Sequence, residues 1–393
     1  MSHRPESISL GEGRFSRLEA IKWWDQSLLR EARVLVVGAG ALGNEVIKNL
    51  SLLGVGRLAI VDMDRIEASN LSRSVLFREA DEAQPKAVVA ARAAQEIYPD
   101  LRAHPIVGNL MSDVGLGWFR WAQVVVAALD NREARVFVNS ACAKVGRAWI
   151  DGGIDILNGL VRAFDPPKTA CYECTMGQAD WDLLAKRRSC SLLARFAASH
   201  GGTPTTASII GAIQAQEVVK RLHGLESLSG SGFVFEGLSH QSYSVSYPIL
   251  EECPWHQRPA DIDAFDQWGS DTPLATIAQE AREKLGGLDA IDFSREFVER
   301  IVCPRCGLEI EVFQPLERLT QEQARCAACQ GECVPVFLHS LACFSPLMGR
   351  TARQLGLPAW DVVWARYEDK AIGIELAKDR LAETQGDWRG RQG

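Results

Sequence analysis

The sequence has no long hydrophobic run and no excess of basic residues. Its longest apolar stretches, such as Val124 to Leu129, have the length of a β-strand and are too short to cross a membrane. The N-terminal residues lead into no apolar segment of signal-peptide length. The net charge is -7 at pH 7, so the chain as a whole does not attract nucleic acid or an anionic membrane. We therefore expect a cytoplasmic protein whose partners are proteins or small molecules, with no nucleic acid and no membrane among them.

Disulfide bonds are also not expected, although the chain has 11 cysteines. Several of these cysteines stand in Cys-x-x-Cys spacings within a long chain of cytosolic character, where metal ligation is the better interpretation. With 393 residues, of which 47% are hydrophobic, the chain is long enough for two or three domains with a sizeable core.

A glycine motif follows the first predicted strand. The apolar run Val34–Val37 is followed by Gly38, Gly40 and Gly43 in the spacing Gly-x-Gly-x-x-Gly. Gly38 permits a tight turn, and Gly40 lets the backbone approach a phosphate. An amphipathic helix that starts near Leu42 would direct its positive N-terminus at the same anion. The motif therefore predicts a nucleotide site.

Apolar runs of strand length alternate with helical patterns from about 31 to 165. The predicted strands are Val34–Val37, Leu58–Val61, His104–Val107, Val124–Leu129 and Ala148–Ile150. This alternation is typical of an α/β fold with a Rossmann-like, mostly parallel sheet. Further along, residues 175–202 have no clean period and are interpreted as a mobile crossover, and Thr205 to Leu222 is predicted to be a long helix.

An ordered series of polar residues stands at the ends of these strands and in the loops after them: Asp62, Asp64, Asn70, Arg73, Lys86, Asp130 and Asn131. Open α/β sheets bind their ligands at such loops. Arg73 and Lys86 suit the neutralisation of a triphosphate, and Asp130 suits Mg²⁺. Asp62 has the spacing of a ribose-binding acid, so the glycine motif and Asp62 alone equally fit an NAD-dependent oxidoreductase. Hydride transfer, however, needs none of the other charges.

Four cysteines in the C-terminal third form an independent metal motif: Cys303, Cys306, Cys326 and Cys329. The gap between the two Cys-x-x-Cys pairs fits a zinc ribbon. Zinc ribbons often contact nucleic acid, but the acidic balance of the chain and the neighbouring glutamates favour a structural or protein-docking role.

The chain resembles the adenylating enzymes that activate ubiquitin and ubiquitin-like or sulfur-carrier proteins, a family that includes the bacterial ThiF and MoeB groups. The resemblance spans about 12 to 256. Its motifs match in order: Arg14-Phe15-Ser16-Arg17, Gly38 to Gly43, Asp62-Met63-Asp64, Asn70 with Arg73, Lys86, and Asp130-Asn131. The resemblance implies adenylation of a carrier protein's C-terminal glycine by ATP and Mg²⁺, with release of pyrophosphate. It also implies a homodimer in which Arg14 reaches the ATP of the partner.

The resemblance further implies a structural zinc site. Cys171 and Cys174 have metal-ligand spacing, and the family closes such a site with a second Cys-x-x-Cys pair after the long helix. Here the second pair is Cys253 and His256, so a Cys₃His site replaces the family's four cysteines.

A cysteine of the crossover is a candidate nucleophile. Cys190 lies within Arg187-Arg188-Ser189-Cys190-Ser191, where two nearby cations favour the thiolate. In the family, an activating enzyme that forms a thioester carries its cysteine in this crossover. The predicted catalytic residues are therefore Cys190, Arg73, Lys86, Asp130 and Arg14.

These patterns divide the chain into four parts. We expect an N-terminal arm at 1–30, a ThiF-like adenylation domain at 31–256 with its crossover at 175–202, a polar linker at 257–272, and a smaller C-terminal domain at 273–393 with the zinc ribbon at 300–335. Within the last part, 356–364 and 372–376 indicate a helix or turn followed by two short strands. From its position, this domain is expected to recognise the carrier or a ubiquitin-conjugating enzyme.

The preferred interpretation is a ubiquitin-like-protein activating enzyme that adenylates its substrate and then forms a thioester on Cys190. Similar bacterial enzymes are encoded beside a ubiquitin-like protein in operons implicated in phage defence. A sulfur-carrier adenylyltransferase of the thiamin or molybdopterin type is the nearest alternative, and it would not need Cys190. An NAD-dependent oxidoreductase, or a zinc-ribbon binding module on an inactive nucleotide fold, fits the charged series less well.

Overall fold

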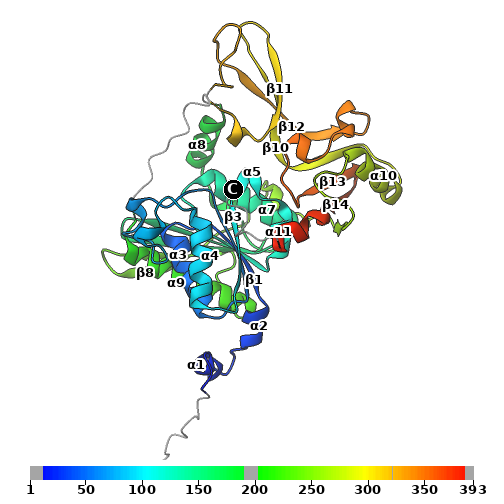
Figure 1. Cartoon of the computed structure of the whole chain (residues 1–393). Coiled ribbons are helices and arrows are strands. Elements are labelled where there is room, and N and C mark those ends of the chain that lie inside the picture. The colour runs from blue at the N-terminus through cyan, green and yellow to red at the C-terminus, as the bar shows by residue number, and fades with distance from the viewer. Residues whose placement is uncertain (1–11, 190–201, 321, 386–393) are drawn as a thin grey trace, which may run out of the picture.

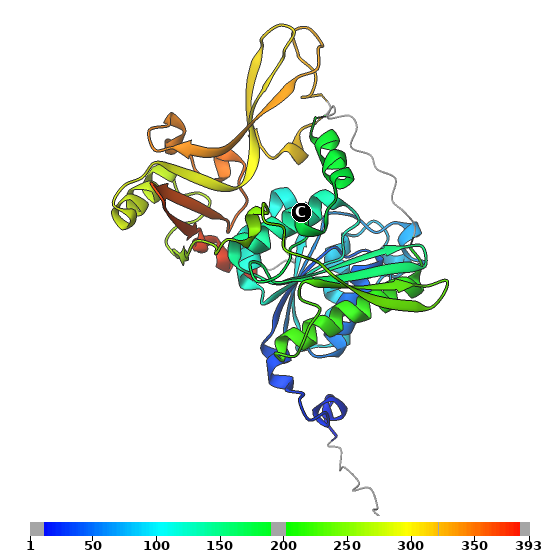
Figure 2. The same cartoon turned by 180° about the vertical axis from the view of Figure 1, so that it is seen from behind.

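The computed structural model describes residues 12–189, 202–320 and 322–385. It contains two sheets, and the second one extends into a long arm that projects away from the first (Figures 1 and 2). No helix among the described residues combines the length and the apolar character that crossing a bilayer requires.

The first sheet has eight strands in the order β3-β2-β1-β4-β5-β6-β7-β8. The strands are β1 (Arg33–Val37), β2 (Arg57–Asp62), β3 (Arg102–Val107), β4 (Val124–Ala127), β5 (Trp149–Asp155), β6 (Asn158–Phe164), β7 (Ser231–Glu236) and β8 (Gln241–Ser246). Strands β1 to β5 are parallel, and β5 to β8 pair antiparallel. The five strands predicted from the sequence overlap β1 to β5, and the predicted α/β class with a mostly parallel sheet is confirmed.

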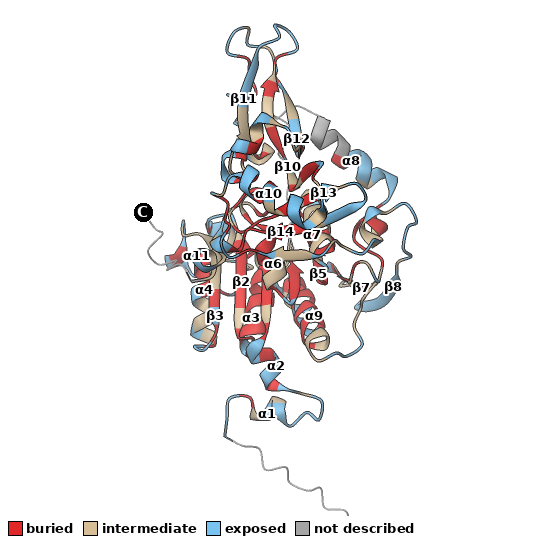
Figure 3. Cartoon of the chain, turned by 90° about the vertical axis from the view of Figure 1, so that its right-hand side faces the viewer, coloured by how far each residue is buried: buried red, intermediate tan, exposed pale blue. Residues whose placement is uncertain are grey.

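Helices cover both faces of this sheet, because alternate residues of its buried strands point to opposite sides. Val34 and Val36 pack into the core under α3 (Ala41–Leu52), α4 (Lys86–Ile97) and α9 (Pro204–Leu222). Leu35 and Val37 pack into the core under α5 (Leu110–Asp113), α6 (Leu116–Trp121) and α7 (Arg132–Val145). Figure 3 shows the buried residues concentrated in the central strands and in these helices. Helix α9 agrees with the helix predicted at Thr205 to Leu222.

The N-terminal segment and the crossover contain further helices. Helices α1 (Ser16–Glu19) and α2 (Gln26–Glu31) precede β1. Within residues 175–202, which are interpreted from the sequence as a mobile crossover, Gln178–Ser189 forms helix α8. Its side chains from 178 to 184 are exposed or half-buried except for Leu184, so its sequence has no amphipathic period that could have predicted it.

The second sheet has the order β11-β10-β13-β14-β9, and β12 pairs with β10. Its elements are β9 (Ile262–Ala264), α10 (Leu274–Leu285), β10 (Ala290–Val302), β11 (Glu309–Gln314), β12 (Val334–Ala342), β13 (Val362–Tyr367), β14 (Lys370–Glu375) and α11 (Arg380–Gln385). The long strand β10 pairs with β13 near its start and with β11 near its end. Its second half, together with β11 and the first half of β12, forms the projecting part of the sheet, and we call residues 298–338 the arm. We call residues 262–385 the C-terminal unit.

The segment 257–272 differs from the polar linker expected there. Strand β9 lies within it and pairs in parallel with β14, and Phe265 and Trp268 are buried in the core of the C-terminal unit. A three-residue strand that joins a sheet through a partner more than 100 residues away leaves no local pattern in the sequence. The two short strands expected near the C-terminus are present as β13 and β14.

A buried interface joins the two sheets. The indole of Trp360 lies where a Cβ at Gly117 would overlap it, and the Trp360 carbonyl accepts the Gly117 N–H at 2.9 Å. Asp361, which is fully buried, accepts the Leu116 N–H at 2.9 Å. Arg120 forms an ion pair with Glu375 across the same contact. These contacts fix the C-terminal unit against helix α6.

A half-buried lysine at this interface makes the stability of the protein depend on pH. Nζ of Lys144 donates to the Ser294 carbonyl at 2.6 Å, and burial, with Arg295 nearby, lowers the pKa of Lys144 to about 8. This folded-state pKa lies below the pKa of Lys144 in the unfolded chain. Between about pH 8 and about pH 10, Lys144 therefore binds more protons in the unfolded chain than in the folded one, and its contribution to the free energy of unfolding rises with pH. Relative to Lys144→Met, the wild type should gain about 2 kcal/mol in free energy of unfolding between about pH 7 and about pH 10. Denaturant titrations at both pH values measure this difference, and a constant difference would contradict it.

Candidate functional site

A cleft of about 1090 Å³ opens at the carboxyl ends of the parallel strands. Residues from the loops after β1, β2, β3 and β4 line one half of it, and residues of β5, β6 and α8 line the other half. This is where an open α/β sheet binds its ligand. Of the predicted nucleotide-site residues, the cleft wall includes Gly38, Gly40, Asp62, Asp64, Arg73, Asp130 and Asn131.

The glycine loop has a conformation that side chains would prevent. Gly38 has φ 95°, and a Cβ there would clash with the Ala128 carbonyl. A Cβ at Gly43 would clash in the same way with the Gly38 carbonyl, whereas Gly40 has open space in front of it. The loop therefore packs tightly against the sheet at two glycines and leaves the third free for a phosphate at the N-terminus of α3.

Two aspartates at the end of β2 organise the adjoining wall. Asp62 accepts the N–H of Ala39 at 2.7 Å and the N–H of Asp64 at 2.8 Å, so it ties β2 to the glycine loop. Burial raises the pKa of Asp62 above its ordinary value, against the effect of these hydrogen bonds. Asp64 forms an ion pair with Nζ of Lys86 at 2.8 Å. The carboxylate of Asp62 retains lone pairs for ribose hydroxyls.

Asn70 and Lys86 do not line the cleft themselves. Oδ1 of Asn70 accepts the N–H of Glu67 at 3.0 Å and closes the turn that leads to Arg73, which does line the cleft. Lys86 begins helix α4, and its Nζ reaches the cleft residue Asp64. Asn70 therefore contacts the backbone of this turn, and Lys86 contacts the cleft wall through Asp64.

The loop after β4 presents a carboxylate to the cleft. Asn131 caps helix α7 by accepting the N–H of Ala134 at 2.8 Å, and its Nδ2 donates to Asp130 at 3.2 Å. Arg135 donates to the carbonyl of Leu129 at 2.6 Å, which fixes the backbone just before Asp130. The hard oxygen of a fixed carboxylate suits Mg²⁺.

A buried ionic cluster centred on Asp151, whose partners Arg135 and Arg162 line the cleft, was missed from the sequence. Asp151 accepts Nε of Arg135 at 2.8 Å and Nη2 of Arg162 at 2.6 Å. Burial alone raises the pKa of Asp151, but these two guanidinium groups outweigh it and lower the pKa. The guanidinium of Arg162 lies 4.7 Å from the ring centroid of Tyr172 and donates to Thr175 at 2.9 Å. Asp151 follows a predicted strand, as Asp62 does, and this position could have indicated it.

One predicted catalytic residue, Arg14, lies away from this cleft. Arg14 donates to the carbonyl of Ile97 and lies over the ring of Tyr98, at the C-terminal end of α4. Since α4 starts at Lys86 and has 12 residues, Arg14 is separated from the cleft end of this helix by about 18 Å along its axis. Cys190 lies outside the described residues.

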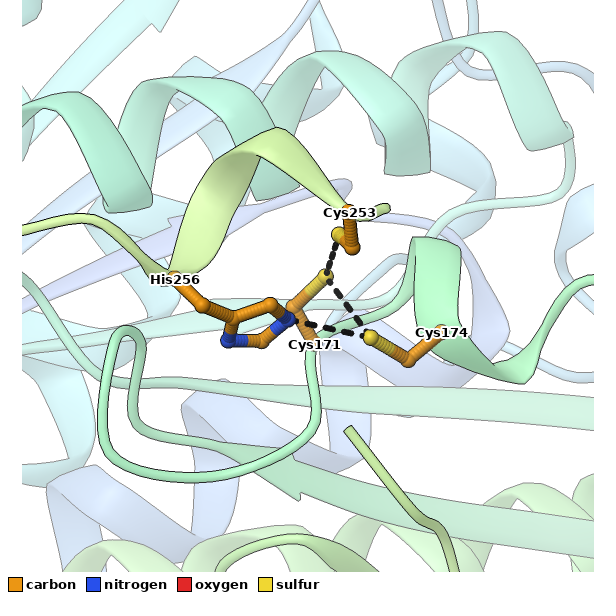
Figure 4. A group of neighbouring side chains, drawn as sticks. All are labelled: Cys171, Cys174, Cys253 and His256. Atoms are coloured by element: carbon orange, nitrogen blue, oxygen red, sulfur yellow. Dashed lines mark hydrogen bonds between the residues drawn. The ribbon is translucent and has the colours of Figure 1, made fainter. Parts of the chain in front are cut away.

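Three cysteines and one histidine form the first candidate metal centre (Figure 4). The ligand atoms of Cys171, Cys174, Cys253 and His256 all lie within 4.8 Å of one another. Sγ of Cys171 is 3.8 Å from Sγ of Cys174 and 3.5 Å from Sγ of Cys253. Tetrahedral zinc with Zn–S bonds of about 2.3 Å separates its sulfurs by about 3.8 Å, so this geometry fits zinc.

The surroundings of this cluster also fit a metal. Nε2 of His256 faces Cys174, while its Nδ1 lies 3.4 Å from the Pro167 carbonyl, the usual partner of a metal-bound imidazole. Nδ2 of Asn139 lies 3.5 Å from Sγ of Cys171, and Oδ1 of Asn139 accepts the N–H of Tyr172 at 3.0 Å. The cluster therefore connects to the wall of the cleft through Tyr172.

The second candidate metal centre lies in the arm. The sulfur atoms of Cys303, Cys306, Cys326 and Cys329 again lie within 4.8 Å of one another. Sγ–Sγ distances of 3.5 Å join Cys303 to Cys329 and Cys306 to Cys326. Four thiolates at this spacing fit a structural zinc ribbon.

Several known proteins resemble this chain. The model of the ThiF family matches residues 14–253. The ubiquitin-activating enzyme E1-like protein of Saccharomyces cerevisiae is 39% identical over 149 residues, which are 37% of this chain and 23% of the yeast protein. The sulfur carrier protein adenylyltransferase of Thermus thermophilus is 31% identical over 252 residues, which are 61% of this chain and 90% of that protein. The chain thus spans less than a quarter of the yeast relative and most of the bacterial one.

A solved structure has a similar fold over part of this chain. Escherichia coli MccB with ATP aligns at a TM-score of 0.53 with 22% identity, covering 64% of this chain and 75% of MccB. At this identity the likeness concerns the fold alone.

Proposed function

This chain belongs to the ThiF family, and on that premise we propose that it uses ATP and Mg²⁺ to adenylate the C-terminal glycine of a ubiquitin-like or sulfur-carrier protein. The observation that carries the proposal is one cleft that unites the glycine loop with Asp62, Arg73 and Asp130. The yeast and Thermus relatives, by their names, belong to enzymes of these two kinds.

In the proposed reaction, a carboxylate oxygen of the carrier's terminal glycine attacks the α-phosphorus of ATP. A new acyl–phosphate bond forms, the bond between the α-phosphorus and the bridging oxygen breaks, and pyrophosphate leaves. Arg73 and Lys86 would stabilise the charge that develops on pyrophosphate. Asp130 would hold Mg²⁺, which supplies further neutralisation of the phosphates. Lys86 would exchange Asp64 for a phosphate oxygen.

We propose that the acyl group then moves to Cys190. Its thiolate attacks the acyl carbonyl carbon, a thioester forms, and AMP leaves with the bonding electrons. Helix α8 ends at Ser189, directly before Cys190, and Leu183 and Leu184 of the same helix line the cleft. The chain that leads to Cys190 is therefore part of the cleft wall.

Cys190→Ala separates the two steps. The wild type is incubated with magnesium-ATP and the ubiquitin-like protein encoded nearest to its gene, and non-reducing electrophoresis with mass spectrometry follows. We expect a thiol-sensitive adduct in the wild type and in Cys343→Ala, a matched control because Cys343 lies in neither metal cluster. We expect carrier adenylate but no adduct in Cys190→Ala.

If all three proteins form carrier adenylate and none of them forms the adduct, the result would favour the alternative, a sulfur-carrier adenylyltransferase. The Thermus relative supports this alternative, because the match covers 90% of its length.

We further propose, from the family resemblance, a homodimer in which Arg14 reaches the partner's ATP, and a role in phage defence. The position of Arg14, remote from the cleft of its own chain, supports the first of these. Sedimentation with and without ATP tests the dimer, and a monomer under both conditions would contradict it. Plaque counts on cells carrying the wild-type or the Cys190→Ala gene test the role in defence, and equal counts would contradict it.

A further inference from the structure

The wall of the cleft beside β3 consists of residues 108–111, which include the start of helix α5. The strand order β3-β2-β1-β4 places Asp62 between this wall and the glycine loop. A nucleotide whose ribose meets Asp62 and whose phosphates extend over Gly40 to Asp130 therefore turns its base toward β3. There the apolar residues Leu110 and Met111 line the cleft.

Helix α5 has only four residues and does not hold this wall by itself. Within the loop, Asn109 caps the helix by accepting the N–H of Met111 at 2.8 Å, and Asp113 accepts the N–H of Asn109 at 2.8 Å.

Arg295 of β10 contacts the backbone of α5 and of the residue that follows it. Its Nη1 donates to the carbonyl of Met111 at 2.6 Å, and its Nη2 donates to the carbonyl of Val114 at 2.8 Å. Arg318, in the turn after β11, forms an ion pair with Asp113 at 2.5 Å. The C-terminal unit thus contacts both ends of α5.

The Arg295 side chain is itself fixed. It is 6% exposed, its Nε donates to the Ser294 hydroxyl at 3.1 Å, and its Nη2 lies 3.6 Å from the buried Asp361 carboxylate. Its guanidinium also lies 5.0 Å from the ring centroid of Phe137. A planar guanidinium with this many fixed partners is preorganised, so it transmits the position of β10 to the Met111 carbonyl.

We propose that the C-terminal unit shapes the base-binding wall of the nucleotide cleft, with Arg295 as the main positioning residue and Arg318 as the second. This rests on the proposed function, in which the cleft binds ATP. It gives the C-terminal unit a role in nucleotide affinity and base selectivity, besides any role in recognising a protein partner.

Arg295→Met in the full chain tests the proposal. Methionine keeps apolar volume but leaves the carbonyls of Met111 and Val114 without their donor. We expect a nonhydrolysable ATP analogue to bind about 10-fold more weakly. The ratio of the affinities for this analogue and for its GTP counterpart should become smaller. The affinity for the carrier, measured separately, should stay unchanged. Arg318→Gln, at an exposed ion pair, should produce a smaller change in the same direction.

Arg366→Met is the matched control, since Arg366 lies on β13 of the same unit and pairs with Asp292 outside the cleft. Isothermal titration calorimetry with both analogues needs no turnover, and thermal unfolding with zinc analysis verifies folding. Wild-type affinity and base preference in Arg295→Met would overturn the proposal, as would an equal loss in Arg366→Met. If Arg295→Met does not fold, unchanged analogue binding in Arg318→Gln overturns it. A wild type that binds neither analogue overturns the proposed function and this inference with it.

Discussion

Asp130→Asn should lower carrier-dependent ATP–pyrophosphate exchange by about 100-fold or more, because it removes the charge proposed to hold Mg²⁺. Asparagine has nearly the same shape as aspartate and can still accept the hydrogen bond from Nδ2 of Asn131. The cap of α7 depends on Asn131 and Ala134, so the substitution leaves the helix start intact. Exchange of labelled pyrophosphate into ATP measures the effect.

The matched control is Asp155→Asn. Asp155 lies at the end of β5 and lines the same cleft, but in its second half. The same loss of one charge there should change exchange by much less. An equal loss of pyrophosphate exchange in both variants would mean that the cleft needs negative charge but not at Asp130 in particular. Undiminished exchange in Asp130→Asn would show that Asp130 does not hold the magnesium ion.

Cys171→Ser should remove one zinc per chain and destabilise the protein by roughly 3 kcal/mol or more, since structural zinc binding contributes to folding free energy. Cys171 is fully buried, and the loop it begins carries Tyr172 and Thr175 into the cleft wall. Losing the metal should therefore also weaken the wall that contacts Arg162 and impair exchange. Metal analysis, thermal unfolding and exchange assays measure the three effects.

Cys306→Ser in the arm is the control for that prediction. It should also remove one zinc, but from a cluster whose cysteines line no part of the cleft. Pyrophosphate exchange should fall much less than in Cys171→Ser, because the arm contacts helix α5 of the cleft wall through the exposed ion pair of Arg318 with Asp113. A Cys171→Ser protein that keeps its full zinc content, or the same loss of exchange in both variants, would contradict the assignment.

The core of the fold could be predicted from the sequence because its signals are local. Strands β1, β2 and β4 are buried on both faces, so they are short continuous apolar runs, and the glycine loop has a fixed spacing. Asp62 and Asp130 could be placed in the site by one rule, that the carboxyl ends of parallel strands meet at one edge of the sheet. The two sets of metal ligands were likewise found from spacing and from the family resemblance.

The rest depends on contacts between residues far apart in the sequence. Arg295 reaches Met111 across 184 positions, and β9 finds its partner β14 across more than 100. Arg162 lies on an antiparallel strand with nothing local to distinguish it from a surface arginine, and only packing brings it to Asp151 and Tyr172. The sequence of helix α8 has no hydrophobic period that would mark it as a helix. Such features are decided by tertiary packing, which one sequence does not display.

The most direct test of carrier activation is the intact mass of the carrier after incubation with this protein and magnesium-ATP. The carrier is the ubiquitin-like protein encoded nearest to the gene, and a version without its C-terminal glycine serves as the control. We predict that the intact carrier gains the mass of one AMP moiety and supports pyrophosphate exchange, and that the truncated carrier does neither. No adenylate and no exchange with the intact carrier, together with binding of NADH, would contradict the account and favour an oxidoreductase.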